Sequence, residues 1–124
     1  MRRVAVLGST GSVGTQTLDV VRAFPDRFKI VALSAGRNIE LLAQQIDEFS
    51  PEYVLCENAE ALKSLPGRDC GTLEEMAALP EVDVVMVSTV GSAGLLPTVR
   101  ALEAGKIVAL ANKEVLIMAG EQVM

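Results

Sequence analysis

The feature that most constrains the fold is a short apolar run that leads into evenly spaced glycines. Residues 4–7 read VAVL, and three glycines then follow at intervals of three positions: Gly8, Gly11 and Gly14. The apolar run predicts a buried strand, and a helical pattern of apolar residues begins directly after the turn. Strand, glycine-rich turn and helix in this order are typical of the first unit of a dinucleotide-binding domain.

The residue types of this turn suit an anion. Glycine lacks a Cβ, so its backbone can approach a phosphate closely, and a helix N-terminus offers unpaired N–H groups. The spacing is G-x-x-G-x-x-G rather than the G-x-G-x-x-G of many dehydrogenases, so a tight turn without a ligand is the alternative. The helix is expected over Ser12–Ala23, with one face formed by Val13, Thr17, Val20, Val21 and Phe24.

Strands and helices alternate along the rest of the chain. Apolar runs predict strands near residues 28–33, 53–56, 82–87 and 107–110. Helical spacing predicts helices near 39–49, 59–65, 73–79 and 95–104, and a last one from Val115 onward. Alternation of this kind predicts parallel strands joined by right-handed crossovers. The expected fold is α/β, a doubly wound parallel sheet (Rossmann-like) in three layers, and the helical pattern that still runs at Met124 suggests a fragment of a longer protein.

Composition narrows the function classes. Half of the 124 residues are hydrophobic but only 3% are aromatic, which suits a parallel sheet of small apolar residues covered on both faces. The net charge is −5 without a basic stripe, so no nucleic-acid partner is expected. The sequence contains no histidine, which excludes a histidine-based triad or metal site in this chain.

The cysteines and the apolar runs indicate the compartment. Cys56 and Cys70 match no zinc or redox spacing, so both are expected to be small buried side chains in a reducing cytosol. Only four apolar residues follow the first three positions, too few for a signal peptide. No apolar run is long enough to cross a membrane. A soluble, cytoplasmic protein is therefore expected.

Arg37 carries the expected choice of cofactor. In a doubly wound sheet, ligands bind where the strands end, and NAD binders usually place Asp or Glu after the second strand. Here no carboxylate occurs in that segment before Glu40, and Arg37 offers a planar fork of donors for a 2′-phosphate. Such a contact is worth about 1.5–3 kcal/mol, or about ten- to a hundredfold preference for NADP(H). The alternative is a solvated surface arginine.

Two further segments fall at predicted strand ends. Residues 88–94 form a second loop of small residues, read either as backbone near the cofactor or as a structural turn. Asn112, Lys113 and Glu114 interrupt an apolar stretch. Lys113 can hold a substrate oxygen or phosphate, and its two neighbours can hydrogen-bond a nicotinamide ribose. The alternative is a charged pair that caps the last helix.

Four segments together resemble one enzyme family. They are GSTGSVGTQTLDVV (8–21), AGRN (35–38), VGSAGLLPT (90–98) and AGKIVALANKE (104–114). In this order they are similar to the N-terminal NADPH-binding domain of the 1-deoxy-D-xylulose 5-phosphate reductoisomerases. The resemblance covers nearly the whole chain, although residues 57–80 are not diagnostic. It implies a homodimeric, NADPH-dependent enzyme that rearranges and reduces 1-deoxy-D-xylulose 5-phosphate to 2-C-methyl-D-erythritol 4-phosphate, a step of non-mevalonate isoprenoid biosynthesis.

The resemblance also implies roles for individual residues. The NADPH pyrophosphate would lie against the turn that begins at Gly8, with contacts from Thr10, Gly11, Ser12 and Val13. The adenosine end would be held by Gly36, Arg37 and Asn38, where the family often has lysine in place of Arg37. The nicotinamide side would be held by Asn112 and Glu114, and Lys113 would contact the substrate.

The family's metal site implies that this chain is incomplete as a catalyst. The divalent metal, Mg or Mn, is held by carboxylates that lie beyond position 124 in the family, so no metal ligand and no catalytic residue is assigned here. The chain alone is expected to bind NADPH without turnover. The alternatives are the cofactor domain of a homoserine-dehydrogenase-like oxidoreductase, and a dinucleotide-binding module without redox function.

Overall fold

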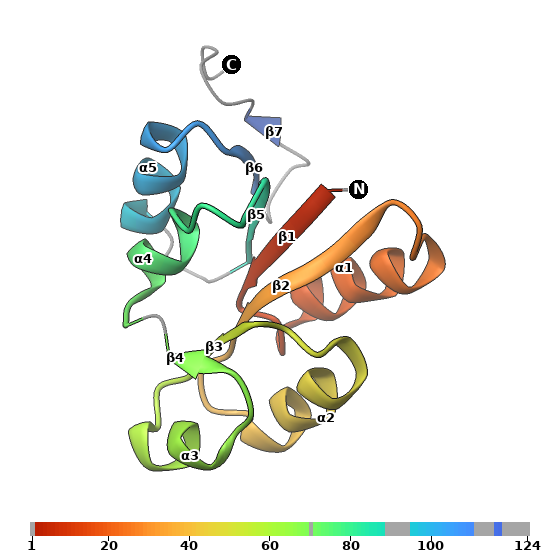
Figure 1. The fold of residues 1–124 in the computed structure, drawn as a ribbon, viewed down its shortest axis with the longest axis vertical. Coiled ribbons are helices and arrows are strands. Elements are labelled where there is room, and N and C mark those ends of the chain that lie inside the picture. Colours follow the sequence, from red (N-terminus) through yellow and green to blue (C-terminus); the bar gives the residue numbers. More distant parts are fainter. Residues whose placement is uncertain (1, 70, 89–94, 111–115, 118–124) are drawn as a thin grey trace.

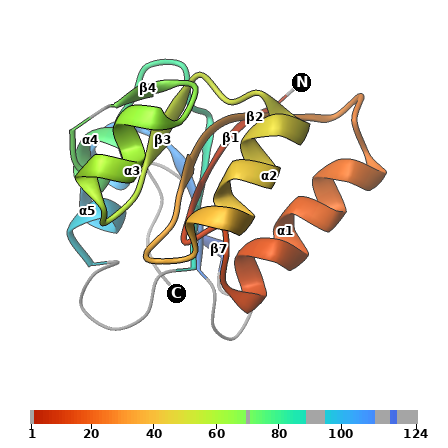
Figure 2. The same cartoon turned by 90° about the horizontal axis from the view of Figure 1, so that it is seen from below.

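A seven-stranded sheet forms the centre of the described part of the chain, with helices on both faces (Figures 1 and 2). The computed structural model describes residues 2–69, 71–88, 95–110 and 116–117. The strands are β1 (Arg2–Leu7), β2 (Phe28–Ser34), β3 (Tyr53–Leu55), β4 (Arg68–Asp69), β5 (Val84–Val87), β6 (Ile107–Leu110) and β7 (Leu116–Ile117). The helices are α1 (Ser12–Ala23), α2 (Ile39–Phe49), α3 (Ala59–Ser64), α4 (Leu73–Ala77) and α5 (Leu95–Glu103).

The strand order β4-β3-β2-β1-β5-β6-β7 confirms the predicted doubly wound arrangement. The pairs from β4 to β6 are all parallel, and only the short β7 pairs antiparallel with β6. The chain moves outward from β1 through β2 and β3, then returns to the other side of β1 with β5. The strand order therefore reverses between β1 and β5, and the ends of these two strands lie side by side.

The central strand β1 is buried on both faces. Val4 and Val6 belong to the core cluster that α1 and α2 cover, whereas Ala5 and Leu7 belong to the cluster beneath α4 and α5. This alternation follows from the two-residue period of a strand. Because both faces are covered, the strand is a continuous apolar run rather than an alternating one. Figure 2 shows the two helical layers on either side of the sheet.

Helix α1 has the predicted bounds but only part of the predicted face. Its buried residues are Gly14, Leu18 and Val21, whereas Val20 and Phe24 are 52% and 49% exposed. The predicted face is therefore correct for Val21, and for the half-buried Val13 and Thr17, but wrong for Val20 and Phe24. Gly14 packs against the turn before the helix, and this contact sets the rotation of α1. The apolar pattern in the sequence does not predict that contact.

Two short strands were not predicted. Residues 116–117 form β7, paired with Val108 and Ala109 of β6, so the prediction of a helix from Val115 onward is wrong for these two positions. A short apolar run does not distinguish helix from strand by its periodicity. The residues around them, 111–115 and 118–124, lie outside the described part. Strand β4 consists of two exposed charged residues. This composition is typical of the edge of a sheet, but it does not indicate a strand in the sequence.

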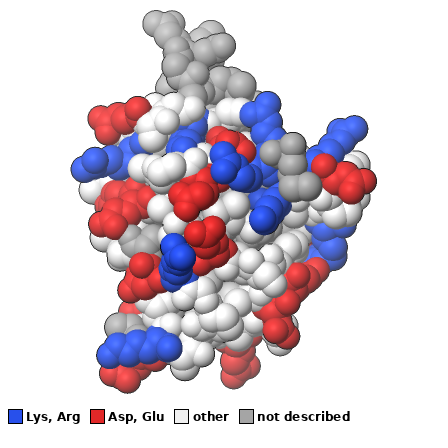
Figure 3. Space-filling view, viewed as in Figure 1, with Lys and Arg blue, Asp and Glu red and all other residues white. Residues whose placement is uncertain are grey.

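No helix within the described ranges is both long and apolar enough to span a membrane. On the face shown in Figure 3, acidic and basic side chains are intermixed. Among the described ion pairs, one joins Arg3 of β1 to Asp83, just before β5.

An ion pair between α1 and α2 generates a test of pH-dependent stability. Arg22 binds both carboxylate oxygens of Glu48 and also contacts Asp19 at 2.6 Å. The hydrogen bond from Arg22 lowers the pKa of Glu48 below its ordinary value of 4.5. The stabilisation is therefore complete above pH 4.5 and is lost as the pH falls through the lower pKa of the folded state.

We expect Glu48→Gln to destabilise the fold by about 1 kcal/mol or less at neutral pH, because both partners are half exposed. Urea unfolding curves of the variant and the wild type should converge as the pH falls through the lowered pKa of Glu48 in the folded state. The matched control is Asp47→Asn, which removes the same charge from an exposed neighbour. An equal loss in both variants would contradict a specific contribution from the ion pair.

Candidate functional site

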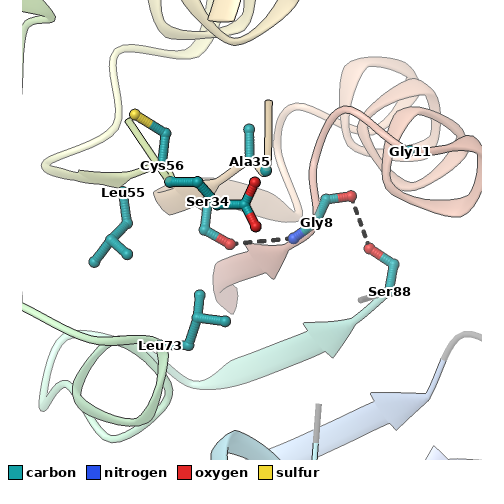
Figure 4. Close-up of a pocket in the computed structure, with 10 residues that line it drawn as sticks. Gly8, Gly11, Ser34, Ala35, Leu55, Cys56, Leu73 and Ser88 are labelled. Atoms are coloured by element: carbon teal, nitrogen blue, oxygen red, sulfur yellow. Dashed lines mark hydrogen bonds between the residues drawn. The ribbon is translucent and has the colours of Figure 1, made fainter. Parts of the chain in front are cut away.

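A pocket opens where β1, β2, β3 and β5 end, at the point where the strand order reverses (Figure 4). Its volume is about 410 Å³. Ligands of open α/β sheets bind in this crevice at the carboxyl ends of the strands. The lining residues come from five segments: Gly8, Gly11, Ser34, Ala35, Gly36, Leu55, Cys56, Glu57, Leu73 and Ser88.

The turn after β1 is fixed by both neighbouring strands. Gly8 has a φ of 88°, a left-handed conformation that favours glycine. Its N–H donates to the Ser34 carbonyl and hydroxyl oxygens, at 3.0 and 3.1 Å. From the other side, the Ser88 hydroxyl lies 2.6 Å from the Leu7 carbonyl oxygen and 2.9 Å from that of Gly8, either of which accepts its proton. Figure 4 shows both sides of this arrangement.

Gly14 and Gly11 are glycines for different reasons. A Cβ on Gly14 would lie 2.1 Å from the Gly8 carbonyl oxygen, so the fold itself excludes a side chain there. A Cβ on Gly11 would lie 3.7 Å from the same oxygen, which is an ordinary contact, and the φ of Gly11 is −80°. Neither its neighbours nor its backbone require glycine at position 11. A bare backbone at this position instead leaves the pocket open beside the N-terminus of α1.

That N-terminus is left without a side-chain partner. Among the helices whose N-caps are described, α2, α3 and α4 are capped by Asn38, Asn58 and Thr72. Helix α1 begins after Gly11 with no side-chain cap and no acidic residue in its first turn. The first N–H groups of a helix have no partner within the helix and carry a partial positive charge. This end of α1 therefore suits an anion at the pocket.

The predicted phosphate-binding residues surround this end of α1. Thr10 lies in the turn, and Ser12 and Val13 open the helix. Gly8 and Gly11 line the pocket itself. The structure thus brings these predicted residues together, and their contact with a phosphate stays a prediction.

The opposite wall is formed by the loop after β2 and the end of β3. Glu57 donates its N–H to the Gly36 carbonyl oxygen at 3.2 Å, which joins the two segments. Arg37 is 95% exposed, and its Nε lies 3.5 Å from the Glu57 carboxylate. The side-chain oxygen of Asn38 accepts the N–H of Leu41, so this residue caps α2. The loop therefore presents a cation next to two lining residues of the pocket.

The residues contributed by β3 and α4 were missed in the sequence. A carboxylate was expected only in the loop after β2, whereas Glu57 reaches Arg37 from the segment after the neighbouring strand β3. Leu55 and Leu73 add apolar surface, and the register that pairs Ser34 with Leu55 is the signal that would have placed the end of β3 here. Cys56 is buried at 8% exposure, as expected, and also lines the pocket.

Several predicted residues lie outside the described part. These are Asn112, Lys113, Glu114, Cys70 and residues 89–94 of the loop predicted at 88–94. Only Ser88 of that loop is described, and it lines the pocket. The roles proposed for the trio at 112–114 therefore stay predictions.

The side chains whose pKa values are shifted lie away from the pocket. Within the described ranges these are Arg3, Arg22, Glu48, Tyr53, Glu81 and Asp83, and none of these lines the pocket. At Tyr53, the hydrogen bond to Glu81 raises the pKa to about 12.

Three features of the site are typical of one class of α/β fold. They are a glycine-rich turn after the first strand, a helix N-terminus without a side-chain cap, and a reversal of strand order beside the turn. The chain has a Rossmann-type doubly wound α/β fold. The family model for 1-deoxy-D-xylulose 5-phosphate reductoisomerase matches residues 4–120. The chain therefore belongs to the 1-deoxy-D-xylulose 5-phosphate reductoisomerase family.

Curated relatives agree with this assignment. The reductoisomerase of Geobacillus kaustophilus is 47% identical over 133 residues, a match that covers 100% of this chain and 35% of the relative. That of Chlorobaculum tepidum is 49% identical over 133 residues, covering 99% of this chain and 35% of the relative. The chain thus spans about a third of the length of these relatives.

Solved structures show the same fold. A crystal structure of DOX-P reductoisomerase in complex with NADPH, fosmidomycin and magnesium superposes with a TM-score of 0.81 at 34% identity, covering 92% of this chain and 31% of that one. The reductoisomerase from Zymomonas mobilis in complex with NADPH gives a TM-score of 0.78 at 36% identity, covering 91% of this chain and 32% of that one.

The contrast between the two glycines generates a prediction for stability. Gly14→Ala should destabilise the fold by about 3 kcal/mol or more, because its Cβ would overlap a backbone oxygen that cannot withdraw. Gly11→Ala should cost only about 1 kcal/mol, since it merely replaces an acceptable N-cap by a poor one. Urea unfolding of both variants measures the difference. Equal losses in the free energy of unfolding would contradict the predicted difference between the two positions.

Proposed function

We propose that residues 1–124 are the NADPH-binding domain of a 1-deoxy-D-xylulose 5-phosphate reductoisomerase. The observation that carries the proposal is the open turn at Gly11, which leaves the uncapped N-terminus of α1 accessible from the pocket. A pyrophosphate needs this combination of bare backbone and unpaired N–H groups. The solved relatives of similar fold that contain NADPH support the same cofactor.

We propose that three groups of residues bind three parts of the cofactor. The pyrophosphate lies against Gly8, Thr10, Gly11, Ser12 and Val13. Gly36, Arg37 and Asn38 hold the adenosine end, with Leu55, Cys56 and Leu73 as the apolar wall. The nicotinamide then extends toward the ends of β5 and β6, where we propose that Asn112 and Glu114 hold its ribose and Lys113 contacts the substrate.

We propose that the whole protein rearranges 1-deoxy-D-xylulose 5-phosphate and reduces the product to 2-C-methyl-D-erythritol 4-phosphate, in non-mevalonate isoprenoid biosynthesis. Bound NADPH supplies the hydride for the reduction. The divalent metal, Mg²⁺ or Mn²⁺, and its carboxylate ligands belong to the remaining two-thirds of the enzyme. The present domain therefore holds and orients the cofactor, and does not turn over substrate by itself.

The setting of the enzyme follows from the same reasoning. We propose a cytoplasmic homodimer that binds no nucleic acid. The buried, unpaired thiol of Cys56 fits a reducing compartment. The acidic net charge of −5 opposes binding to a polyanion.

Arg37 provides the direct test of cofactor choice. Isothermal titration with NADPH and NADH, on the domain and on the full-length enzyme, should show tighter binding of NADPH. Arg37→Ala should weaken NADPH binding by about ten- to a hundredfold and leave NADH nearly unchanged, because only NADPH carries the 2′-phosphate. Circular dichroism confirms that each variant is folded. NADH binding that equals or exceeds NADPH binding in the wild type would contradict the assignment of Arg37.

Glu57 provides the matched variant on the other side of the ion pair. Its carboxylate lies beside Arg37 and would face the 2′-phosphate as a like charge. Glu57→Gln should therefore tighten NADPH binding by about threefold, a modest change because the pair is exposed and screened. NADH binding should not change. A loss of affinity for both cofactors would instead show that Glu57 binds the ribose hydroxyls.

A further inference from the structure

Gln45 is a polar side chain on the buried face of α2. It is 5% exposed, and the adjacent residues of that face, Leu42 and Ile46, are buried and apolar. Burial of an amide is unfavourable unless its hydrogen bonds are replaced, so packing alone would favour an aliphatic residue here. The position therefore has a polar side chain for a reason other than the core.

The amide of Gln45 reaches the turn after β1. Its Nε2 donates to the Ser9 carbonyl oxygen at 2.9 Å, and Ser9 itself is 0% exposed. The N–H of Ser9 donates to the Ser34 carbonyl oxygen at 2.7 Å. Both backbone polar groups of Ser9 are thus fixed, one by β2 and the other by α2.

This hydrogen bond also fixes the next N–H group. The Ser9 carbonyl and the Thr10 N–H belong to one planar peptide, and no cis peptide bond is present in the described residues. In a trans peptide these two groups point in opposite directions. With the carbonyl directed inward to Gln45, the Thr10 N–H is directed away from the buried amide, on the outer side of the turn. A peptide that flipped would point its carbonyl oxygen outward instead, toward a bound anion.

The polar groups at this contact are not optimised for stability. Within the described residues, the Ser9 hydroxyl and the Gln45 Oε1 are buried side-chain atoms without a hydrogen-bond partner. Unpartnered buried polar atoms are costly. Their presence where Gln45 of α2 meets the turn supports a functional role for the contact.

We propose that Gln45 is a positioning residue that orients the peptide between Ser9 and Thr10 for the cofactor pyrophosphate. This inference rests on the proposed function. Helix α2 begins at Ile39, directly after the loop that carries Arg37, so the same helix connects the 2′-phosphate end of the site to its pyrophosphate end.

The first test replaces the donor without changing the volume. Gln45→Met keeps the length and the packing of the side chain but cannot donate to Ser9. We expect NADP⁺ binding to weaken by about tenfold, the loss that accompanies one well-placed hydrogen bond. Binding of 2′-AMP, which lacks the pyrophosphate, should change by less than about twofold, since its contacts are at the other end of the site. Equal weakening of both ligands would overturn the proposal.

The second test restores the donor by protonation. In Gln45→Glu the ionised carboxylate repels the Ser9 carbonyl, whereas the protonated acid donates to it. Burial raises the pKa of such a carboxyl, so the variant should bind NADP⁺ poorly near pH 8 and approach the wild type near pH 5.5. The quantity compared is the ratio of wild-type to variant affinity, because protonation of the 2′-phosphate affects both proteins alike. Gln45→Met should show no such recovery.

The matched control is Gln44→Glu, the same change at the exposed neighbouring position of α2, which should bind NADP⁺ like the wild type at both pH values. If Gln45→Met does not fold, the pH dependence of Gln45→Glu decides the question. A pH-independent ratio for Gln45→Glu would overturn the positioning role. Absence of NADP⁺ binding by wild-type full-length enzyme would instead refute the proposed function, and the two failures are thereby distinguishable.

Discussion

The close approach of α1 to the turn before it is the contact on which the site depends. With no side chain at Gly14, the helix packs directly on the Gly8 carbonyl oxygen, and a single Cβ would prevent this. The contact sets the rotation of α1, which buries Leu18 and Val21 but leaves Val20, a member of the predicted face, 52% exposed. It also places the N-terminus of α1 at the crevice between β1 and β5. One missing methyl group thus determines both the packing of a helix and the position of an anion site.

The fold was largely predictable because its signals are local. The apolar runs of β1, β2, β5 and β6 and the bounds of α1 and α2 follow from periodicity, glycines and prolines, and their alternation fixes the parallel topology. The errors have a common cause. The rotation of α1 depends on the Gly14 contact, β4 is a pair of charged residues at an edge, and β7 forms only because β6 lies beside it. Each of these depends on a partner that is distant in the sequence.

The site was predictable where a single segment builds it, and not where neighbouring strands combine. Gly8 and Gly11 could be identified from their spacing, and Gly36 from its place after β2. Glu57 and Leu73 could not, because they enter the pocket through the pairing of β3 with β2 and the docking of α4. Gln45 was missed for the same reason, since only the tertiary structure shows that a polar residue on the buried face of α2 meets the backbone of a turn 36 positions earlier.

The central place of β1 in the sheet has a consequence for folding. The Ser88 hydroxyl that closes the pocket on one side bonds to the Leu7 carbonyl oxygen, 81 positions earlier in the chain. Contacts between such distant positions form slowly, because a long loop must close before any of them is gained. The half built from β1, α1 and β2 has only short separations to close. We therefore expect the two walls of the crevice to come together at different stages of folding, so that a cofactor that needs both walls binds only after the slower half has formed.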